Sequence, residues 1–358
     1  MKMVLSVHWN GRCRHYIINE AHGHVFIEHH CFKSLHDLIR YYSVNHVPIT
    51  KNSGVFLMFP VPHQEWELRH DQVELGRIIG EGAYSGLFEG ILTKGNKKVE
   101  VAVKVRKGKP LHKVEMSEIC KEARIMRCYE HPNIVKFYGV AVDKEPMMVL
   151  MELISDGSLD SYLVKYGVDM EVHEKLTMCI DAACGLQYLH SMGCIHRDVA
   201  ARNCLVKDRH VKLTDFGLSR EISTTEENCR LSDMKQRLPV RWLAPETLKT
   251  ACYTTRSDVF SFGVLMWEIF ADAMEPYSDM TISEVNEQVK RGYRMPRPEG
   301  MPKDVGKVMR KGCFRTEPKK RWTLTSVGLE LSKLHAKYAN YSESEREQTL
   351  IYPEEREI

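Results

Sequence analysis

Ile195-His196-Arg197-Asp198-Val199-Ala200-Ala201-Arg202-Asn203 and, a dozen residues further on, Asp215-Phe216-Gly217 decide the fold of this chain. A short predicted strand, Val211–Leu213, separates the two motifs. Transfer of a phosphoryl group requires an acceptor for the substrate's hydroxyl proton and oxygen ligands for a metal ion. Asp198 can accept the proton, while Asn203 and Asp215 supply oxygens of the kind that Mg²⁺ prefers. The order and spacing of these residues predict phosphoryl-transfer chemistry.

A glycine-rich turn lies upstream of these motifs, at Ile79-Gly80-Glu81-Gly82-Ala83-Tyr84-Ser85-Gly86-Leu87. Placed between two strands, such a turn lets backbone N–H groups approach the phosphates of a nucleotide. The same pattern also fits a plain hairpin, so the turn alone does not decide between the two interpretations.

A strand with alternating valines follows this turn, over Val99–Val105. Its alternation places Ala102 and Lys104 on one face, where the ammonium of Lys104 could hold the α- and β-phosphates of a nucleotide. A carboxylate is needed to fix that lysine, and Glu122 lies on a helix predicted from Ser117 to Met126. Either residue alone would be interpreted as part of the surface, so each gains its meaning from the other motifs.

Together these elements resemble the eukaryotic protein kinase family over roughly residues 73 to 336. The resemblance implies an α+β, two-lobed protein kinase fold with a small β-rich N-lobe and a mostly helical C-lobe. ATP would bind in the cleft between the lobes together with Mg²⁺ or Mn²⁺. In this family a residue matching Asp258 braces the catalytic loop, and the glutamate of Ala244-Pro245-Glu246 pairs with a buried arginine, here Arg321.

The resemblance also implies roles for single residues. Leu87, Ala102 and Leu205 would sandwich the adenine, with Met151 as gatekeeper and Glu152–Ile154 as the hinge. The implied catalytic residues are Asp198, Lys104, Glu122, Arg202 and Asn203, and the implied metal ligands are Asn203 and Asp215. The implied nucleotide-binding residues are Ile79, Gly80, Glu81, Gly82, Ala83, Tyr84, Ser85, Gly86, Leu87, Ala102, Lys104, Met151, Glu152, Ile154, Leu205 and Asp215.

Two features favour tyrosine over serine or threonine as the phosphate acceptor. Serine/threonine kinases usually place a lysine two residues after the catalytic aspartate, whereas Ala200-Ala201-Arg202 stands here, as in most non-receptor tyrosine kinases. Further on, Leu238-Pro239-Val240-Arg241-Trp242 resembles the tyrosine-kinase substrate shelf, a platform from which a phenol ring can reach Asp198. The resemblance therefore implies a non-receptor protein tyrosine kinase that acts on protein substrates bearing tyrosine.

A catalytically weak pseudokinase, acting as a scaffold, is the alternative. Its support is the absence of a tyrosine from the activation segment and an irregular glycine loop, in which Ser85 stands where the third glycine is expected and Gly86 is displaced by one. Because Gly86 supplies part of the lost backbone freedom, we expect weaker ATP binding and not its loss. The complete set of catalytic residues argues against this alternative.

The activation segment differs from the family pattern. Between Asp215 and Glu246 there is no tyrosine whose phosphate could pair with Arg197. Either Glu226 or Glu227 takes that place beside Arg197 and gives basal activity, or both glutamates are simply solvated.

Residues 1–62 form a separate predicted unit. A helix is predicted at Ser34–Tyr42, and strands are predicted at Met3–Val7, His15–Ile18, Val25–Glu28 and Val55–Phe59. The unit resembles the second half of an SH2 domain, which reads phosphotyrosine through an arginine on an early strand. That strand should precede Val4 and is not in this sequence. Phosphotyrosine ligands are therefore doubtful, and so is an adaptor function.

The domain prediction is a partial SH2 domain at 1–62, a linker at 63–72, a protein tyrosine kinase domain at 73–336 and a charged, disordered tail at 337–358. This order resembles the Fes/Fer group of cytoplasmic tyrosine kinases. The net charge of +3 is too small to argue for a nucleic-acid partner. Eleven cysteines without a signal peptide predict reduced thiols. With no stretch apolar enough to span a bilayer, we expect a cytoplasmic protein with at most peripheral membrane association.

Overall fold

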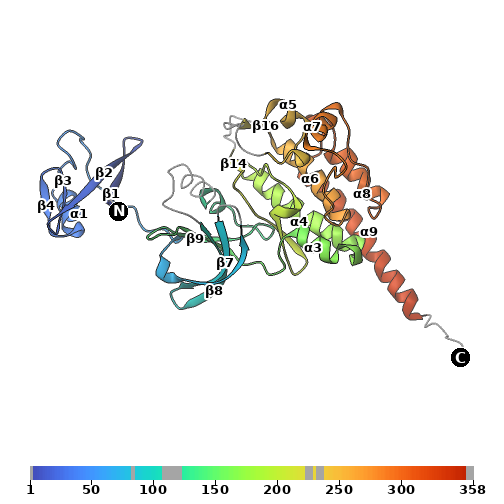
Figure 1. The fold of residues 1–358 in the computed structure, drawn as a ribbon, viewed down its shortest axis with the longest axis horizontal. Coiled ribbons are helices and arrows are strands. Elements are labelled where there is room, and N and C mark those ends of the chain that lie inside the picture. The colour runs from blue at the N-terminus through green and yellow to red at the C-terminus, as the bar shows by residue number, and fades with distance from the viewer. Residues whose placement is uncertain (1–2, 82–84, 107–122, 222–228, 231–237, 352–358) are drawn as a thin grey trace. The chain divides into compact units, whose positions relative to one another are not determined.

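The computed structural model of this chain describes residues 3–81, 85–106, 123–221, 229–230 and 238–351. Six residues to which the sequence assigned roles lie outside the described residues: Gly82, Ala83, Tyr84, Glu122, Glu226 and Glu227. The chain divides into two units, Met1–Gln64 and Glu65–Ile358 (Figure 1). This division falls inside the predicted linker, and the finer domain boundaries stay predictions.

The first unit is an antiparallel sheet with one helix packed on it. Its four strands lie side by side in chain order: β1 (Met3–Trp9), β2 (Arg12–Ala21), β3 (His24–Ile27) and β4 (His30–Phe32). Helix α1 (Leu35–Val44) begins after Ser34, whose hydroxyl caps it by accepting a hydrogen bond from Asp37 N–H at 3.1 Å. Leu38 and Tyr42 of α1 are buried in one cluster with Ile18 of the sheet.

Val55–Phe59, predicted as a strand, is not a strand in the structure. Val55 is fully buried, and its carbonyl oxygen accepts a hydrogen bond from Ile49 N–H at 2.9 Å. Among the described residues the stretch has no neighbouring strand to pair with, although Val55 is buried in the core cluster and Leu57 packs against it half-buried. The apolar pattern identified a buried residue correctly and its backbone conformation wrongly.

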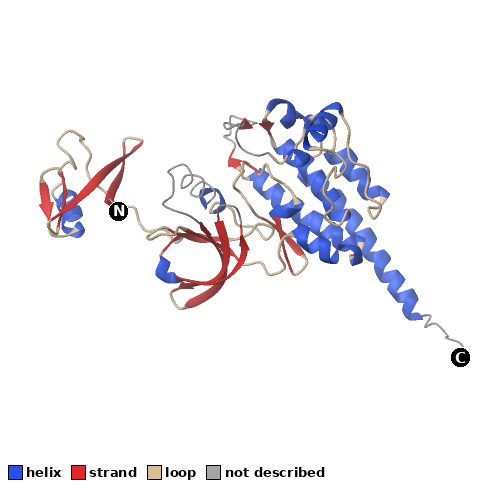
Figure 2. Cartoon of the chain, in the orientation of Figure 1, coloured by secondary structure: helices blue, strands red, loops and turns tan. Residues whose placement is uncertain are grey.

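The second unit begins with a six-stranded sheet (Figure 2). Neighbours follow the order β5-β9-β10-β8-β7-β6, and only β5 and β9 run parallel. In β8, Val101 and Val103 are fully buried in a cluster with Leu150, so Ala102 and Lys104 lie on the opposite face. The strands are β5 (Glu67–Leu68), β6 (Val73–Glu81), β7 (Ser85–Lys94), β8 (Lys97–Arg106), β9 (Phe137–Ala141) and β10 (Met148–Glu152).

The rest of this unit is mostly helical. Its helices are α3 (Leu159–Tyr166), α4 (Val172–Ser191), α5 (Pro245–Thr250), α6 (Thr255–Phe270), α7 (Ile282–Arg291), α8 (Lys303–Val308) and α9 (Leu324–Ile351). Single 3-10 turns lie at His70–Gln72, Gly167–Asp169, Ala201–Asn203, Val240–Trp242 and Pro318–Lys320, and a π-helical turn, η5, spans Met309–Cys313. The short strands pair as β11 (Cys194–Ile195) with β14 (Arg220–Glu221), β12 (Cys204–Lys207) with β13 (His210–Leu213), and β15 (Cys229–Arg230) with β16 (Cys252–Tyr253). The predicted α+β, two-lobed architecture is confirmed.

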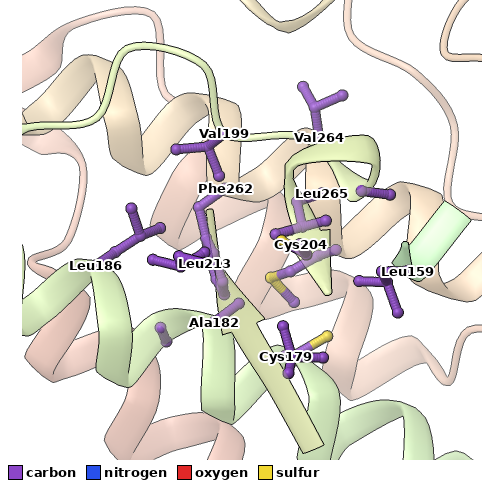
Figure 3. Close-up of a cluster of buried hydrophobic side chains, with 14 of the residues drawn as sticks. Leu159, Cys179, Ala182, Leu186, Val199, Cys204, Leu213, Phe262, Val264 and Leu265 are labelled. Atoms are coloured by element: carbon purple, nitrogen blue, oxygen red, sulfur yellow. The ribbon is translucent and has the colours of Figure 1, made fainter. Parts of the chain in front are cut away.

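Helix α6 lies in the centre of the helical lobe. Figure 3 shows Phe262 and Leu265 of α6 among Leu186 and Ala182 of α4 and Leu213 of β13, all within one buried cluster. A helix that is apolar on every side is stable only in an interior. Because α6 is held on all sides, the polar groups on it are fixed in position.

Helix α9 corrects the prediction of a disordered tail from residue 337, since it continues to Ile351. Its first turns are anchored by the buried side chains of Leu324, Val327 and Leu331. Once such a nucleus exists, each further residue extends the helix at low cost, and the sequence from Ser332 to Ile351 contains no glycine or proline to end it. Within the described ranges, no helix is both long enough and apolar enough to cross a membrane.

Candidate active site

The loop that carries Asp198 is held by Asp258, in the first turn of α6. The Asp258 carboxylate accepts backbone hydrogen bonds from His196 at 2.8 Å and from Arg197 at 2.9 Å. Its side chain is 1% exposed and also contacts His190 Nε2 at 3.0 Å. Arg197 has a left-handed backbone, with φ 72°, a conformation that costs a non-glycine residue free energy unless its surroundings hold it. Asp258 therefore braces the loop, as expected.

Asp198 projects from this loop between two partners on the following turn. Arg202 donates from Nη2 to the Asp198 carboxylate, and Asn203 Nδ2 donates to the Asp198 carbonyl oxygen at 2.8 Å. The Asp198 side chain is only 13% exposed. Burial raises its pKa above the ordinary value, although Arg202 and Asn203 act in the opposite direction. A carboxylate titrating nearer to neutral pH is a more effective proton acceptor.

Asn203 and Asp215, the predicted metal ligands, come together because their segments are joined by backbone bonds. Thr214 N–H donates to the Asn203 carbonyl oxygen at 3.0 Å. Since Asn203 Nδ2 is bonded to Asp198, the side-chain oxygen is the group left to bind a cation. Asp215 is exposed, and its proximity to Asp198 contributes to the raised pKa of the latter.

This donor set fits Mg²⁺, which is usually held by one or two protein oxygens and keeps several waters. In the part of the chain that the structure describes, no cluster of three or more His, Cys, Asp or Glu could form an all-protein metal cage. A carboxylate and an amide oxygen of this kind suit a metal that a nucleotide also binds.

Phe216 points into the core. It is fully buried, with its ring centre 5.4 Å from that of His196 and 6.2 Å from that of Tyr129. Met126 belongs to the same buried cluster. The inward position of Phe216 leaves its neighbour Asp215 on the exposed side, where a metal ligand is needed.

The apolar residues predicted to enclose the adenine lie in one hydrophobic cluster. Ala102 on β8 faces Met151 on β10 in strand register, and Lys104 faces Leu87 on β7. The cluster contains Leu87, Ala102, Met151, Ile154 and Leu205. Ile79, Gly80 and Glu81 end β6, with Gly80 opposite Leu87 and Glu81 opposite Gly86. The structure thus brings the described part of the predicted nucleotide site together, while the role of each residue stays a prediction.

The side chain of Glu152, in the predicted hinge, is bound to the helical lobe. Lys212 Nζ on β13 donates to both of its oxygens, at 3.0 and 2.8 Å, and Lys207 Nζ lies 3.5 Å away. Burial alone would raise the pKa of Glu152, but its hydrogen bonds with Lys212 and with Lys136 N–H hold the pKa below its ordinary value. Any contact of Glu152 with a nucleotide is therefore left to its backbone. Sequence reasoning missed this anchor.

Glu268 is a second residue that sequence reasoning missed. Its carboxylate, buried on α6, accepts hydrogen bonds from Trp242 Nε1 at 2.9 Å and from Ala201 N–H at 3.1 Å. Burial raises the pKa of Glu268 to about 7. Arg202 contacts the same tryptophan, because its guanidinium lies 4.3 Å from the Trp242 ring centre. Glu268 thus joins the catalytic loop to the predicted substrate shelf; a lone acid in an apolar helix was its only signal.

Arg197 has an aromatic partner. Its guanidinium lies 4.1 Å from the ring centre of Tyr253, which is 2% exposed, and burial raises the pKa of that tyrosine. Tyr253 belongs to β16, which pairs with Cys229–Arg230 of the activation segment. The proposed pairing with Glu226 or Glu227 falls outside the described residues.

The end of the activation segment is fixed by the ion pair expected from the sequence. Arg321 donates to both Glu246 oxygens at 2.6 Å, and its side chain is fully buried. The two parallel hydrogen bonds of an arginine to a carboxylate fix orientation as well as distance.

Comparison with known proteins agrees with this geometry. The family "Protein tyrosine and serine/threonine kinase" matches residues 73–331, and the SH2 domain family matches residues 2–42. Human tyrosine-protein kinase Fer is 37% identical over 336 residues, which are 93% of this chain and 40% of Fer. The tyrosine-protein kinase transforming protein Fps of avian sarcoma virus (strain PRCII) is 37% identical over 339 residues, 94% of this chain and 62% of Fps.

Fer-related kinase 1 of Caenorhabditis elegans is 35% identical over 328 residues, which are 90% of this chain and 82% of that protein. The chain therefore spans 40% of Fer and 62% of Fps, but most of the nematode relative. The kinase match covers well over half of the chain, from the start of β6 into α9. This chain belongs to the protein tyrosine and serine/threonine kinase family, with relatives of the Fer and Fps type.

Proposed function

We propose that this chain is a protein tyrosine kinase, which transfers the γ-phosphoryl group of ATP to tyrosine hydroxyls of proteins. The observation that carries the proposal is the buried Asp198 carboxylate, bonded to Arg202 and placed beside Asn203 and Asp215. A proton acceptor and two metal-binding oxygens at one point are what phosphoryl transfer requires of a protein.

In the proposed reaction the tyrosine oxygen forms a bond to the γ-phosphorus as the bond from that phosphorus to the β–γ bridging oxygen breaks. Asp198 accepts the hydroxyl proton, and ADP leaves. Mg²⁺, held by Asn203 and Asp215, would neutralise charge on the phosphates; Mn²⁺ could serve in its place. Lys104, on the cleft face of β8, would pair with the α- and β-phosphates.

The preference for tyrosine is supported by the surroundings of Asp198. Ala200 is fully buried and has no polar group to offer a substrate, so Arg202 is the cation beside Asp198. The same guanidinium stacks on Trp242 of the predicted shelf. Through this stack Arg202 links the predicted shelf to Asp198. A long phenol side chain needs this arrangement, and a short serine side chain does not.

The test is transfer of ³²P from Mg²⁺-ATP to random Glu/Tyr and Ser/Thr copolymers. We expect label on tyrosine, with its loss in Asp198→Asn and its retention in Asp169→Asn, a control at an exposed position in the C-lobe. Label on the Ser/Thr copolymer alone would contradict the tyrosine assignment. If ATP binds and neither copolymer is labelled, the chain is a scaffold and the proposal of catalysis is wrong.

We also propose a cytoplasmic location and protein substrates bearing tyrosine. None of the nine cysteines whose side chains the structure describes forms a disulfide, which suits a reducing compartment. Fractionation of cells expressing the chain tests the location. Phosphotyrosine stays a doubtful ligand for residues 2–42, and retention on immobilised phosphotyrosine would show that this prediction is wrong.

A further inference from the structure

Six cationic side chains surround a hollow on the helical lobe, at the surface formed by α8 and η5. They are Arg297, Lys303, Lys307, Arg310, Lys311 and Arg315, which we call the basic hollow. The hollow has a volume of about 460 Å³, and Gly306 is its only other lining residue. A second hollow, of about 550 Å³, adjoins it through Arg310 and Arg315. The basic hollow alone carries twice the formal net charge of the whole chain, which is +3.

The charges of the basic hollow are not matched by carboxylates in the part of the chain that the structure describes. Among the residues that the structure describes, no carboxylate forms an ion pair with any of the six. Two acids near these cations in sequence, Asp304 and Glu317, are engaged elsewhere. Asp304 binds Lys337 Nζ at 2.7 Å and the Tyr338 hydroxyl at 2.8 Å. Glu317 binds Lys320 Nζ at 2.9 Å. Six like charges repel one another across the hollow, and binding of an anion from outside would relieve this repulsion.

The cations are held in place by the fold. Lys303, Lys307, Arg310 and Lys311 follow helical spacing along α8 and η5, so they share one face. Across the axis, Val305, Val308 and Met309 are buried and fix the orientation of that face. The backbone positions that carry these four cations are therefore fixed on one face of the helix before any ligand arrives.

Arg297 reaches the hollow because residue 306 is a glycine. A Cβ at Gly306 would lie 2.6 Å from Arg297 Cδ, so a larger residue would displace this side chain. The Arg297 guanidinium is further held by the carbonyl oxygens of Met301, Pro298 and Glu299. Arg315 Nε is held in turn by the Lys311 carbonyl at 3.2 Å.

The helix is also irregular at this surface. The π-helical turn Met309–Cys313 carries Arg310 and Lys311 outward. Such turns are rare and often mark functional sites. This irregularity and the unpaired charges are independent observations, and both point to a ligand at the same surface.

We propose that the basic hollow binds a small molecule that bears several phosphate groups, such as a polyphosphorylated inositol, free or as the headgroup of a lipid. Arginine forms paired hydrogen bonds with phosphate oxygens and lysine supplies point charge, and the hollow has both. Its volume lies in the usual range for small-ligand sites. It has no exposed apolar side chain in its lining that would anchor an acidic peptide. The proposal is independent of the kinase reaction.

The test uses the full chain and inositol hexakisphosphate as probe, with binding measured by titration calorimetry. Lys307→Ala, Arg310→Ala and Lys311→Ala together should weaken binding at least about tenfold, because charge-assisted hydrogen bonds to phosphate are lost. The control removes the same charge elsewhere on the helical lobe, by Lys165→Ala, Lys249→Ala and Lys333→Ala, three exposed positions. The control should bind as the wild type does. All six substitutions are at exposed side chains, so both variants should fold, and their thermal unfolding checks this.

Vesicles of phosphatidylcholine, with and without phosphatidylinositol bisphosphate, separate the two sources of the ligand. Sedimentation with the phosphoinositide vesicles that is lost in the hollow variant and kept in the control variant assigns a lipid headgroup. Binding of the soluble probe alone assigns a free polyphosphate. Equal affinity of both variants for inositol hexakisphosphate, or no binding by the wild type, overturns the proposal. So does equal binding of polyglutamate, because the site would then not select phosphate.

Discussion

The Arg202 guanidinium lies 4.3 Å from the ring centre of Trp242, while its Nη2 donates to the Asp198 carboxylate. One side chain therefore touches both the proposed base and the proposed substrate shelf. The Glu268 carboxylate stabilises this arrangement, because it accepts hydrogen bonds from Trp242 Nε1 and from Ala201 N–H. A change at Glu268 should consequently reach Asp198 without touching the substrate.

Glu268 should make the stability of the folded chain depend on pH. Its pKa is about 7 in the fold against 4.5 as the reference value. Between these two values the folded state binds more protons than the unfolded state, so the free energy of unfolding should fall as pH rises through this window. The full effect is about 3 kcal/mol. Glu268→Gln keeps an acceptor oxygen and cannot ionise, so it should flatten the curve. Urea unfolding at several pH values measures this, and parallel curves for wild type and variant would contradict it.

Tyr253 should support Arg197 through its ring. Tyr253→Phe keeps the aromatic face at 4.1 Å from the guanidinium and should change stability little. Tyr253→Leu removes the cation–π contact of a desolvated arginine and should cost about 2 kcal/mol, with lower kinase activity because the catalytic loop loosens. Chemical unfolding and steady-state rates of both variants check this. An equal loss in the two variants would mean that the hydroxyl, and not the ring, holds Arg197.

Much of the site could be predicted because its residues are close in sequence. Asp198, Arg202 and Asn203 lie within two turns of one loop, and a short hairpin returns Asp215 to them, with Thr214 bonded to Asn203. The alternation in β8 similarly placed Lys104 and Ala102 on one face without knowledge of the partner strands. Local periodicity and spacing carry this kind of information.

The contacts that the sequence did not predict join residues far apart. Glu268 meets Ala201 across 67 residues, and Glu152 meets Lys212 across 60. No local pattern distinguishes such a glutamate from a surface one, because its partner is chosen by tertiary packing. The error at Val55–Phe59 has the same origin: a strand needs a neighbour, and the pattern of one segment does not say whether a neighbour exists.

The ion pairs that anchor the side chain of Glu152 should contribute to the free energy of unfolding mainly through Lys212. Lys212 and Glu152 are 18% and 15% exposed and joined by two hydrogen bonds, so Lys212→Met should lower the free energy of unfolding by about 1–3 kcal/mol. Lys207 contacts the same carboxylate at 3.5 Å and is 45% exposed, so Lys207→Met, the matched control, should cost about 0.5 kcal/mol or less. Unfolding of the two variants in guanidinium chloride measures both costs. Equal costs would show that Lys212 is no stronger an anchor than a surface lysine.

Arg202 should set the pH at which Asp198 becomes a competent base. Burial raises the pKa of Asp198, and the Arg202 charge acts against that rise. Arg202→Ala should therefore raise the Asp198 pKa further and move the acid limb of the kcat/KM profile to higher pH, since the limb reports the free enzyme's base. Arg202→Lys keeps the charge and should move the limb less, although it loses the planar stack on Trp242. Asp198→Asn should lower kcat by about 10²–10⁴ at every pH. An acid limb that stays in place in Arg202→Ala would mean that another group titrates there, and Asp198 would lose its proposed role as the base.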